Sequence, residues 1–257
     1  MYDLHNHILP GIDDGAPTRD ETLAMAKIAD RDGTILTLAT PHRKDVTEAN
    51  AFDTIRSLIE DLNQELEQNQ LKVRLVLGME NHIDPDLPAA IQAGHALTMN
   101  NSRYILVELP FFQFPNYVHE VLFQLRIQGL TPVIAHPERQ SQIQDDSDIL
   151  SHLVENGALA QITAGSIIGS FGKGARRSAQ QLMERRLVHI IASDCHRARG
   201  DRTPILSAGQ AAAAKIIGAT EARMLTVDNP RALLNNLDFE PTTPLPKPKR
   251  GWWIFRH

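Results

Sequence analysis

Residues 3–15 read Asp-Leu-His-Asn-His-Ile-Leu-Pro-Gly-Ile-Asp-Asp-Gly, a short apolar strand followed by histidines and aspartates. Side chains alternate along a strand, so His5 and His7 point the same way. Two imidazoles on one strand can chelate a divalent metal, and a carboxylate a few residues further on adds an oxygen ligand. Asp13 and Asp14 both qualify as that carboxylate, and the residues alone do not choose between them.

The rest of the chain alternates short apolar runs with longer amphipathic stretches. This alternation predicts strands connected by helices, and therefore an α/β fold with a mostly parallel sheet. We expect strands at residues 2–8, 34–39, 73–79, 104–109, 131–135, 158–162 and 188–192. We expect helices at residues 19–32, 49–68, 116–128, 147–156, 174–186, 205–217 and 221–235. Thr18 and Glu21 have capping-box spacing at the start of the first helix, and Gly33 follows its end.

Six of the seven expected strands end in His, Asp or Glu. The residues concerned are His5, His7, Asp14, His42, Glu80, Glu108, His136, Asp194 and His196. One such residue after a strand is most often a solvated loop residue, but six repeats are hard to credit to chance. In a parallel barrel the C-terminal strand ends share one face, where these side chains would converge. The repetition therefore favours a closed or nearly closed barrel over an open sheet.

Five imidazoles and four carboxylates are more donors than one ion takes, so they suit a cluster of two or three metals. A donor set without thiolate favours Mn, Fe or Zn over Mg or Ca. Such clusters lower the pKa of bound water towards about 7 and suit attack on phosphate esters. Arg139, three residues beyond His136, is placed to bind the phosphate. Cys195 has Asp201 where a cysteine phosphatase needs arginine, so we expect a packing residue there.

Composition limits the classes of protein to which the chain can belong. The chain has 257 residues, 42% of them hydrophobic, which is enough for one large domain over residues 1–238. A net charge of -5 argues against a general nucleic-acid binder. One cysteine, no signal-peptide pattern and no long apolar run lead us to expect a cytoplasmic protein. Residues 239–257 are proline-rich and then basic and aromatic, and we expect an extended, poorly packed tail.

These motifs resemble those of the polymerase-and-histidinol-phosphatase (PHP) superfamily. Within it, the sequence is similar to the bacterial manganese-dependent protein-tyrosine phosphatases of capsule and exopolysaccharide operons. The resemblance rests on the opening at residues 5–15 and on Thr40-Pro41-His42, Gly78-Met79-Glu80, Ala135-His136-Pro137-Glu138-Arg139 and Ser193-Asp194-Cys195-His196. It implies a distorted seven-stranded (β/α) barrel of PHP type, with the metal site at the C-terminal ends of the strands.

The resemblance also implies a role for each site residue. One metal would be held by His5, His7, Glu80 and Asp194. Glu80 would bridge to a second metal, bound also by Glu108 and His136, and a third would be held by Asp14, His42 and His196. Asp14 is thus favoured over Asp13. Phosphate would be bound by Arg139 and by a second arginine, Arg202 or alternatively Arg199, beside a substrate loop containing Gly165 and Ser166.

The function implied is hydrolysis of phosphotyrosine with Mn²⁺, on the C-terminal tyrosine cluster of a bacterial tyrosine autokinase that controls polysaccharide synthesis. Two alternatives stay open. One is a small-molecule phosphatase of histidinol-phosphatase type, and the other is a non-catalytic protein that binds phosphotyrosine tails. The resemblance further suggests a homo-oligomer, and the kinase or the C-terminal tail would bring the protein near the membrane.

Overall fold

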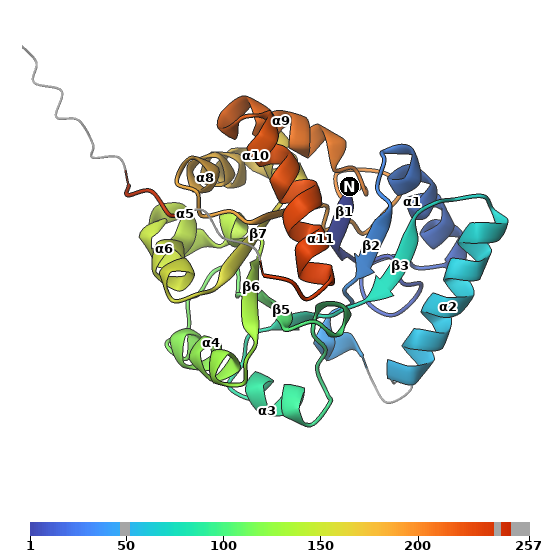
Figure 1. Cartoon of the computed structure of the whole chain (residues 1–257), viewed down its shortest axis with the longest axis horizontal. Coiled ribbons are helices and arrows are strands. Elements are labelled where there is room, and N and C mark those ends of the chain that lie inside the picture. The colour runs from blue at the N-terminus through green and yellow to red at the C-terminus, as the bar shows by residue number, and fades with distance from the viewer. Residues whose placement is uncertain (47–51, 239–242, 248–257) are drawn as a thin grey trace, which may run out of the picture.

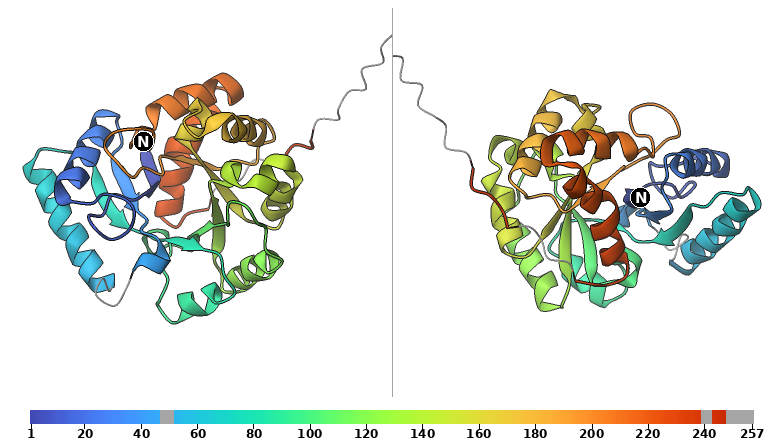
Figure 2. Two further views of the ribbon diagram at one scale, coloured as in Figure 1. Left: turned by 180° about the vertical axis from the view of Figure 1, so that it is seen from behind. Right: turned by 45° about the horizontal axis from the view of Figure 1, so that its top comes forward.

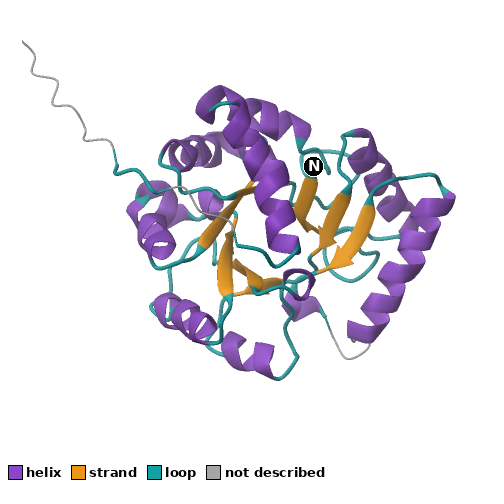
Figure 3. Cartoon of the chain, viewed as in Figure 1, coloured by secondary structure: helices purple, strands orange, loops and turns teal. Residues whose placement is uncertain are grey.

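The computed structural model describes residues 1–46, 52–238 and 243–247, in which helices surround a central group of parallel strands (Figure 1, Figure 3). The strands of these residues are β1 (Tyr2–Asn6), β2 (Leu36–Ala39), β3 (Arg74–Leu77), β4 (Glu80–His82), β5 (Tyr104–Glu108), β6 (Thr131–Ala135), β7 (Leu159–Thr163) and β8 (Ile190–Ala192). They form two sheets, β1-β2-β3 and β4-β5-β6-β7-β8, with every neighbouring pair parallel. The predicted parallel α/β fold is confirmed.

The predicted helices form, although the one at residues 221–235 is divided into three shorter helices, and the short helices at residues 87–92, 141–145 and 164–168 were not predicted. They are α1 (Arg19–Arg31), α2 (Phe52–Gln68), α3 (Leu87–Gln92), α4 (Val118–Ile127), α5 (Ser141–Asp145), α6 (Asp148–Glu155), α7 (Ala164–Ile168), α8 (Gly172–Glu184), α9 (Ser207–Ile217), α10 (Ala219–Arg223) and α11 (Asn229–Leu234). Single turns of other helix types are η1 (Arg43–Asp45), η3 (Met99–Asn101), η4 (Pro137–Arg139) and η5 (Met224–Asp228). The predicted cap of α1 forms, because the Glu21 N–H donates to Thr18 Oγ1. The predicted start of α2, residues 49–51, lies outside the described residues.

The predicted strand at residues 73–79 ends early, at Leu77, and an unpredicted short strand, Glu80–His82, follows it in the other sheet. β3 ends the first sheet and β4 begins the second, with Gly78 between them. A Cβ atom on Gly78 would lie 2.9 Å from the Leu38 side chain, so the chain passes too close to β2 for a larger residue. Isolated backbone bridges join the sheets at both seams, Asn6 with Cys195 and His42 with Glu80. Most of the predicted metal ligands lie at these two seams, whereas Glu108 and His136 come from the ends of β5 and β6.

An apolar core fills the space between the sheets at the end away from the predicted site. Leu4 of β1, Leu106 of β5 and Ile190 of β8 are fully buried in it. α11 lies across this group of strands in Figure 1 and, from another angle, in Figure 2. Its Leu233 and Leu234 pack into the same core. This packing leaves the C-terminal ends of the strands for polar side chains.

The described part of the predicted tail, residues 243–247, runs along the end of α8. The Leu245 N–H donates to the Arg185 carbonyl at 2.8 Å, and Lys247 Nζ lies 2.9 Å from Asp146 Oδ1. The remainder of the tail, 239–242 and 248–257, lies outside the described residues. Across the described ranges, no helix has the length and hydropathy needed to cross a membrane.

Candidate metal centre

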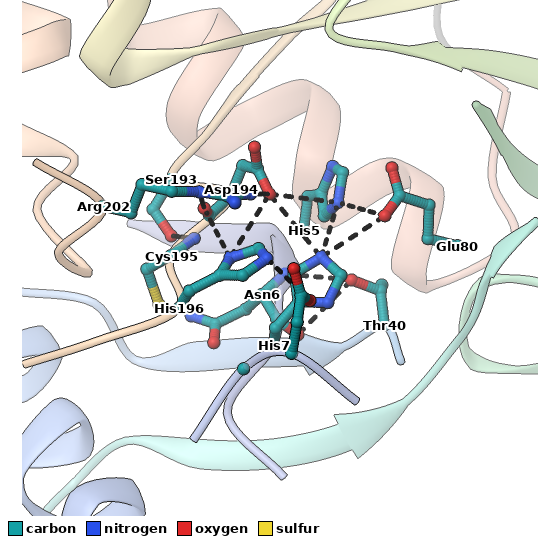
Figure 4. Close-up of polar contacts among 12 residues, drawn as sticks. His5, Asn6, His7, Thr40, Glu80, Ser193, Asp194, Cys195, His196 and Arg202 are labelled. Atoms are coloured by element: carbon teal, nitrogen blue, oxygen red, sulfur yellow. Dashed lines mark hydrogen bonds and ion pairs between the residues drawn. The ribbon is translucent and has the colours of Figure 1, made fainter. Parts of the chain in front are cut away.

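The two histidines of the opening motif converge on two buried carboxylates (Figure 4). Their Nε2 atoms lie 3.2 Å apart. His5 Nε2 lies 3.2 Å from Glu80 Oε2 and 3.5 Å from Asp194 Oδ1, and His7 Nε2 lies 3.3 and 3.5 Å from the same two atoms. On the far side of its ring, His5 Nδ1 lies 2.9 Å from Gln161 Oε1. The bond to Gln161 fixes the His5 ring with Nε2 towards the carboxylates.

Asp13 and Asp14 take different positions, which the sequence could not decide. Asp13 Oδ2 accepts from His7 Nδ1 at 2.7 Å, and Asp13 Oδ1 accepts from the Gly15 N–H at 2.9 Å. Asp14, whose side chain is 63% exposed, instead has its carboxylate 3.1 Å from His196 Nε2 and 3.5 Å from His42 Nε2. Asp13 therefore orients an imidazole, while Asp14 belongs to the converging donors.

Glu80, the first residue of β4, lies at the centre of the cluster. Its Oε2 atom is 3.0 Å from His42 Nδ1, and its Oε1 atom is 3.0 Å from His136 Nε2. His136 Nε2 is also 3.8 Å from Glu108 Oε1, at the end of β5. The two Glu80 oxygens thus face different imidazoles, an arrangement suited to a bridging carboxylate.

Two cationic side chains flank the cluster. Arg139 Nη1 lies 2.7 Å from Asp194 Oδ2, and Arg202 Nη2 lies 2.8 Å from Asp194 Oδ1. Arg202 Nε donates in addition to the Asp194 carbonyl at 3.3 Å. Arg199 lies exposed on the same loop. Of the two arginines left open by the sequence, the structure brings Arg202 to the site.

The backbone is strained at two of the predicted ligands. His136 has φ of 31° and Asp194 has φ of 51°, and both values are unfavourable for residues with a Cβ atom. Both residues follow the end of a strand, β6 and β8 respectively. The left-handed conformation turns each chain sharply at the strand end, where its side chain joins the cluster.

Aromatic rings hold Arg139 in place. Its Cζ lies 4.8 Å from the centre of the Phe111 ring and 4.5 Å from the centre of the Phe171 ring. Phe171 packs where Gly165 leaves room, since a Cβ atom there would lie 2.8 Å from the ring. No sequence pattern predicts this pair of rings, because Phe111 and Phe171 lie 60 residues apart and form no motif.

The resemblance implied that Ser166 contacts the substrate, but its contacts in the structure are of another kind. It is fully buried, and its hydroxyl donates to Glu138 Oε1 at 2.7 Å. The Thr163 N–H donates to the same oxygen at 3.0 Å. Glu138 belongs to η4, so Ser166 supports the turn that carries Arg139. Gly165 acts on the same arginine through Phe171.

Opposing effects set the charges of the cluster. Burial lowers the pKa of His7, but hydrogen bonds to Asp13 and Glu80 outweigh it and raise the pKa to about 10. Burial raises the pKa of Glu80, whereas the neighbouring imidazoles, His5 foremost, bring it well below its ordinary value. Burial and the Glu80 charge raise the pKa of Glu108. Glu80 is therefore ionised beside a protonated His7.

Burial and neighbouring charges also shift the pKa values of Asp194 and His196. Burial raises the pKa of Asp194, but the charges of His5 and Arg202 outweigh it and lower the pKa below its ordinary value. Burial and the charge of His7 lower the pKa of His196 to about 3. His196 is thus a neutral imidazole at neutral pH, with its lone pair available to a cation.

The donor set fits a divalent-metal cluster. Oxygen and imidazole nitrogen donors lie within 4.8 Å of one another in three groups: His7, Asp14, His42 and His196; His5, His7 and Glu80; and His42, Glu80 and Glu108. His196 Nε2 is buried and makes no hydrogen bond, although Asp14 Oδ1 lies 3.1 Å away, as suits two ligands of one metal. All nine side chains predicted as ligands lie at this end of the strands. Fold and site define an α/β protein with a candidate multinuclear metal centre beside a pair of arginines.

Comparison with known proteins agrees with this class. The family model for capsular polysaccharide synthesis, CpsB/CapC, matches residues 1–235. Tyrosine-protein phosphatase YwqE of Bacillus subtilis (strain 168) is 37% identical over 196 residues, 76% of this chain and 77% of YwqE. Tyrosine-protein phosphatase CpsB of Streptococcus pneumoniae is 28% identical over 250 residues, 91% of this chain and 98% of CpsB.

A solved structure extends the likeness to the fold. A chain from the crystal structures of YwqE and CpsB, described as unique metal-dependent tyrosine phosphatases, matches with a TM-score of 0.91 and 34% identity. The match covers 96% of this chain and 99% of the other. The protein belongs to the CpsB/CapC family of capsular polysaccharide synthesis, and the resemblance predicted from its motifs is confirmed.

Proposed function

We propose that this protein is a metal-dependent phosphatase that removes phosphate from phosphotyrosine in proteins. The observation that carries the proposal is the convergence of nine potential metal ligands with Arg139 and Arg202 at one end of the strands. The names of YwqE and CpsB as tyrosine-protein phosphatases support it. The two sheets would then correspond to the distorted seven-stranded barrel of the PHP superfamily, with β3 and β4 as its divided strand.

Two or three ions occupy the centre in this proposal, with Mn²⁺ as the expected metal and Fe or Zn as alternatives. The ligand groups are His5, His7, Glu80 and Asp194 for one ion, Glu80, Glu108 and His136 for the second, and Asp14, His42 and His196 for the third. When bound, the ions supply Lewis-acid activation of water and neutralise phosphate charge. Mixed nitrogen and oxygen donors support a transition metal over Mg or Ca.

The chain's own cations position the phosphate. Arg139 and Arg202 bind different oxygens of Asp194, so both guanidinium groups lie at the edge of the cluster. Forked guanidinium donors match phosphate oxygens, and charge-assisted hydrogen bonds are the strong ones. The aromatic rings around Arg139 restrict its rotation. The contacts of Gly165 with Phe171 and of Ser166 with Glu138 support an indirect role for both residues, in positioning Arg139.

The physiological substrate in this proposal is the tyrosine-phosphorylated C-terminal cluster of a bacterial tyrosine kinase that controls capsular or exopolysaccharide synthesis. Family membership in capsular polysaccharide synthesis supports it. The kinase, or the basic and aromatic residues 247–257, would bring the enzyme to the membrane surface. Self-association into a homo-oligomer remains part of the proposal.

Release of inorganic phosphate tests the function. Metal-stripped protein is incubated with a phosphotyrosine peptide, a phosphoserine peptide or histidinol phosphate, with and without added Mn²⁺. We expect manganese-dependent release from the phosphotyrosine peptide, abolished in His136→Ala and unchanged in His95→Ala, a histidine exposed away from the cluster. Faster release from histidinol phosphate would favour the small-molecule phosphatase. Tight peptide binding without release would favour a non-catalytic binder.

A further inference from the structure

We propose that Phe112 receives the phenyl ring of phosphotyrosine and so makes this site selective for aryl over alkyl phosphate esters. The inference rests on the proposed function, because it concerns the substrate of the same metal centre. It adds to that function a residue outside the metal ligands and the arginines.

The residues on both sides of Phe112 are hydrogen-bonded to residues next to the site. It follows β5, whose last residue is the predicted ligand Glu108. The Ser141 N–H donates to the Phe111 carbonyl at 2.8 Å, and Gln140 Nε2 donates to the Gln113 carbonyl at 3.1 Å. Gln140 and Ser141 directly follow η4, so the segment is held against the turn that carries Arg139.

Phe111 forms a rigid base for its neighbour. Its ring stacks on the His136 imidazole, with centroids 5.4 Å apart and planes at 18°. The Arg139 guanidinium lies over the same ring at 4.8 Å. A ring held by a predicted metal ligand and a phosphate-binding side chain has little freedom to move.

Phe112 lies beside this base and is 85% exposed. Its ring centroid is 6.5 Å from that of Phe111, at an angle of 60°, within the range of edge-to-face aromatic contact. A phenylalanine so exposed loses the benefit of burial unless a ligand covers it. The loop after β5 therefore presents an uncovered aromatic ring beside Phe111, the ring on which His136 and Arg139 pack.

This arrangement distinguishes two kinds of phosphate ester. When Arg139 binds the phosphate of phosphotyrosine, the attached phenyl ring extends from the cluster and can pack against Phe112. A phosphoserine or phosphothreonine side chain has no ring to place there. Aromatic packing and the burial of the two rings correspond to about a 3- to 30-fold preference for aryl over alkyl phosphate esters in binding.

Paired non-hydrolysable ligands test the proposal. Phenylphosphonate and methylphosphonate share the phosphonate group and differ in the ring, and their binding to the Mn²⁺-loaded protein is measured by calorimetry. We expect Phe112→Ala to weaken phenylphosphonate binding about 3- to 30-fold and to leave methylphosphonate unchanged. Phe112→Trp should keep the preference. Phe123→Ala, at an exposed phenylalanine of α4, is the matched control and should behave as wild type.

The kinetic counterpart is a fall in kcat/KM for the phosphotyrosine peptide in Phe112→Ala, with no fall for the phosphoserine peptide. Equal weakening of both phosphonates, or an intact phenyl preference in Phe112→Ala, overturns the role of Phe112. Failure of wild-type protein to hydrolyse any phosphotyrosine peptide would instead defeat the proposed function, and the phosphonate pair still reports on the ring.

Discussion

Replacing Arg202 by alanine tests which arginine of the loop after β8 serves the site. Arg202 makes two contacts with Asp194, at 2.8 Å to the carboxylate and 3.3 Å to the carbonyl. Arg199 lies exposed three residues earlier on the same loop. The Arg202 carbonyl accepts from the His196 and Arg197 N–H groups, so an alanine variant keeps the backbone bonds that shape the loop.

The expected loss follows from the interaction removed. A hydrogen bond between charged groups contributes about 1.5–3 kcal/mol, which corresponds to about a 10- to 150-fold fall in kcat/KM for a phosphotyrosine peptide in Arg202→Ala. Arg202→Lys keeps the charge but not the fork, and we expect an intermediate loss. Arg199→Ala should retain the wild-type kcat/KM for the same peptide.

A titration with Mn²⁺ separates the two roles of Arg202. If the side chain binds phosphate, the activity of Arg202→Ala stays low at saturating Mn²⁺ and the metal content is unchanged. If it serves mainly to hold Asp194 in place, excess metal restores activity. An equal loss in Arg199→Ala, or full activity in Arg202→Ala, would refute the assignment of Arg202 as the second phosphate-binding arginine.

Three further predictions concern metal binding, stability and the terminus. Asp13→Ala should raise the Mn²⁺ concentration for half-maximal activity about 10- to 100-fold, because His7 loses its orienting partner; an unchanged value would contradict this. Burial lowers the pKa of His189 from 6.5 to about 4, so its contribution to stability is complete above pH 6.5 and is lost as the pH falls towards 4. In urea unfolding of metal-free protein, the free energy of unfolding of wild type should fall by about 2 kcal/mol more than that of His189→Gln between pH 8 and pH 5. Parallel plots of this free energy against pH would show that His189 is not responsible. Wild-type protein should sediment with anionic vesicles but not with neutral ones, and the double variant Trp252→Ala/Trp253→Ala should sediment with neither. Equal sedimentation of the two proteins would exclude a membrane-anchoring role of these tryptophans.

The candidate site was predictable because its residues follow strands in a regular manner. Period-two alternation put His5, in β1, and His7, just after it, on the same side of the chain, and parallel strands bring their C-terminal ends together. The choice between Asp13 and Asp14 depends on which carboxylate reaches His7 Nδ1 across a turn. Two adjacent aspartates carry no sequence signal for that difference.

Long-range packing explains what the sequence left out. The break between β3 and β4 arises where Gly78 passes the Leu38 side chain, and the apolar run at residues 73–79 gives no sign of this contact. The rings around Arg139 meet only after folding. Non-glycine residues at positive φ, such as His136 and Asp194, are also invisible to propensity, since their strain is maintained by the surrounding structure.

The two seams between the sheets account for the position of the site. At one seam the Asn6–Cys195 bridge brings His7 beside the residues after β8, and at the other the His42–Glu80 bridge pairs two predicted ligands directly. The first sheet thus supplies donors from β1 and β2, and the second supplies them from β4, β5, β6 and β8. Metal ions bound by both sets would connect the sheets where the backbone ladder is interrupted, so metal binding would stabilise the fold as well as build the site.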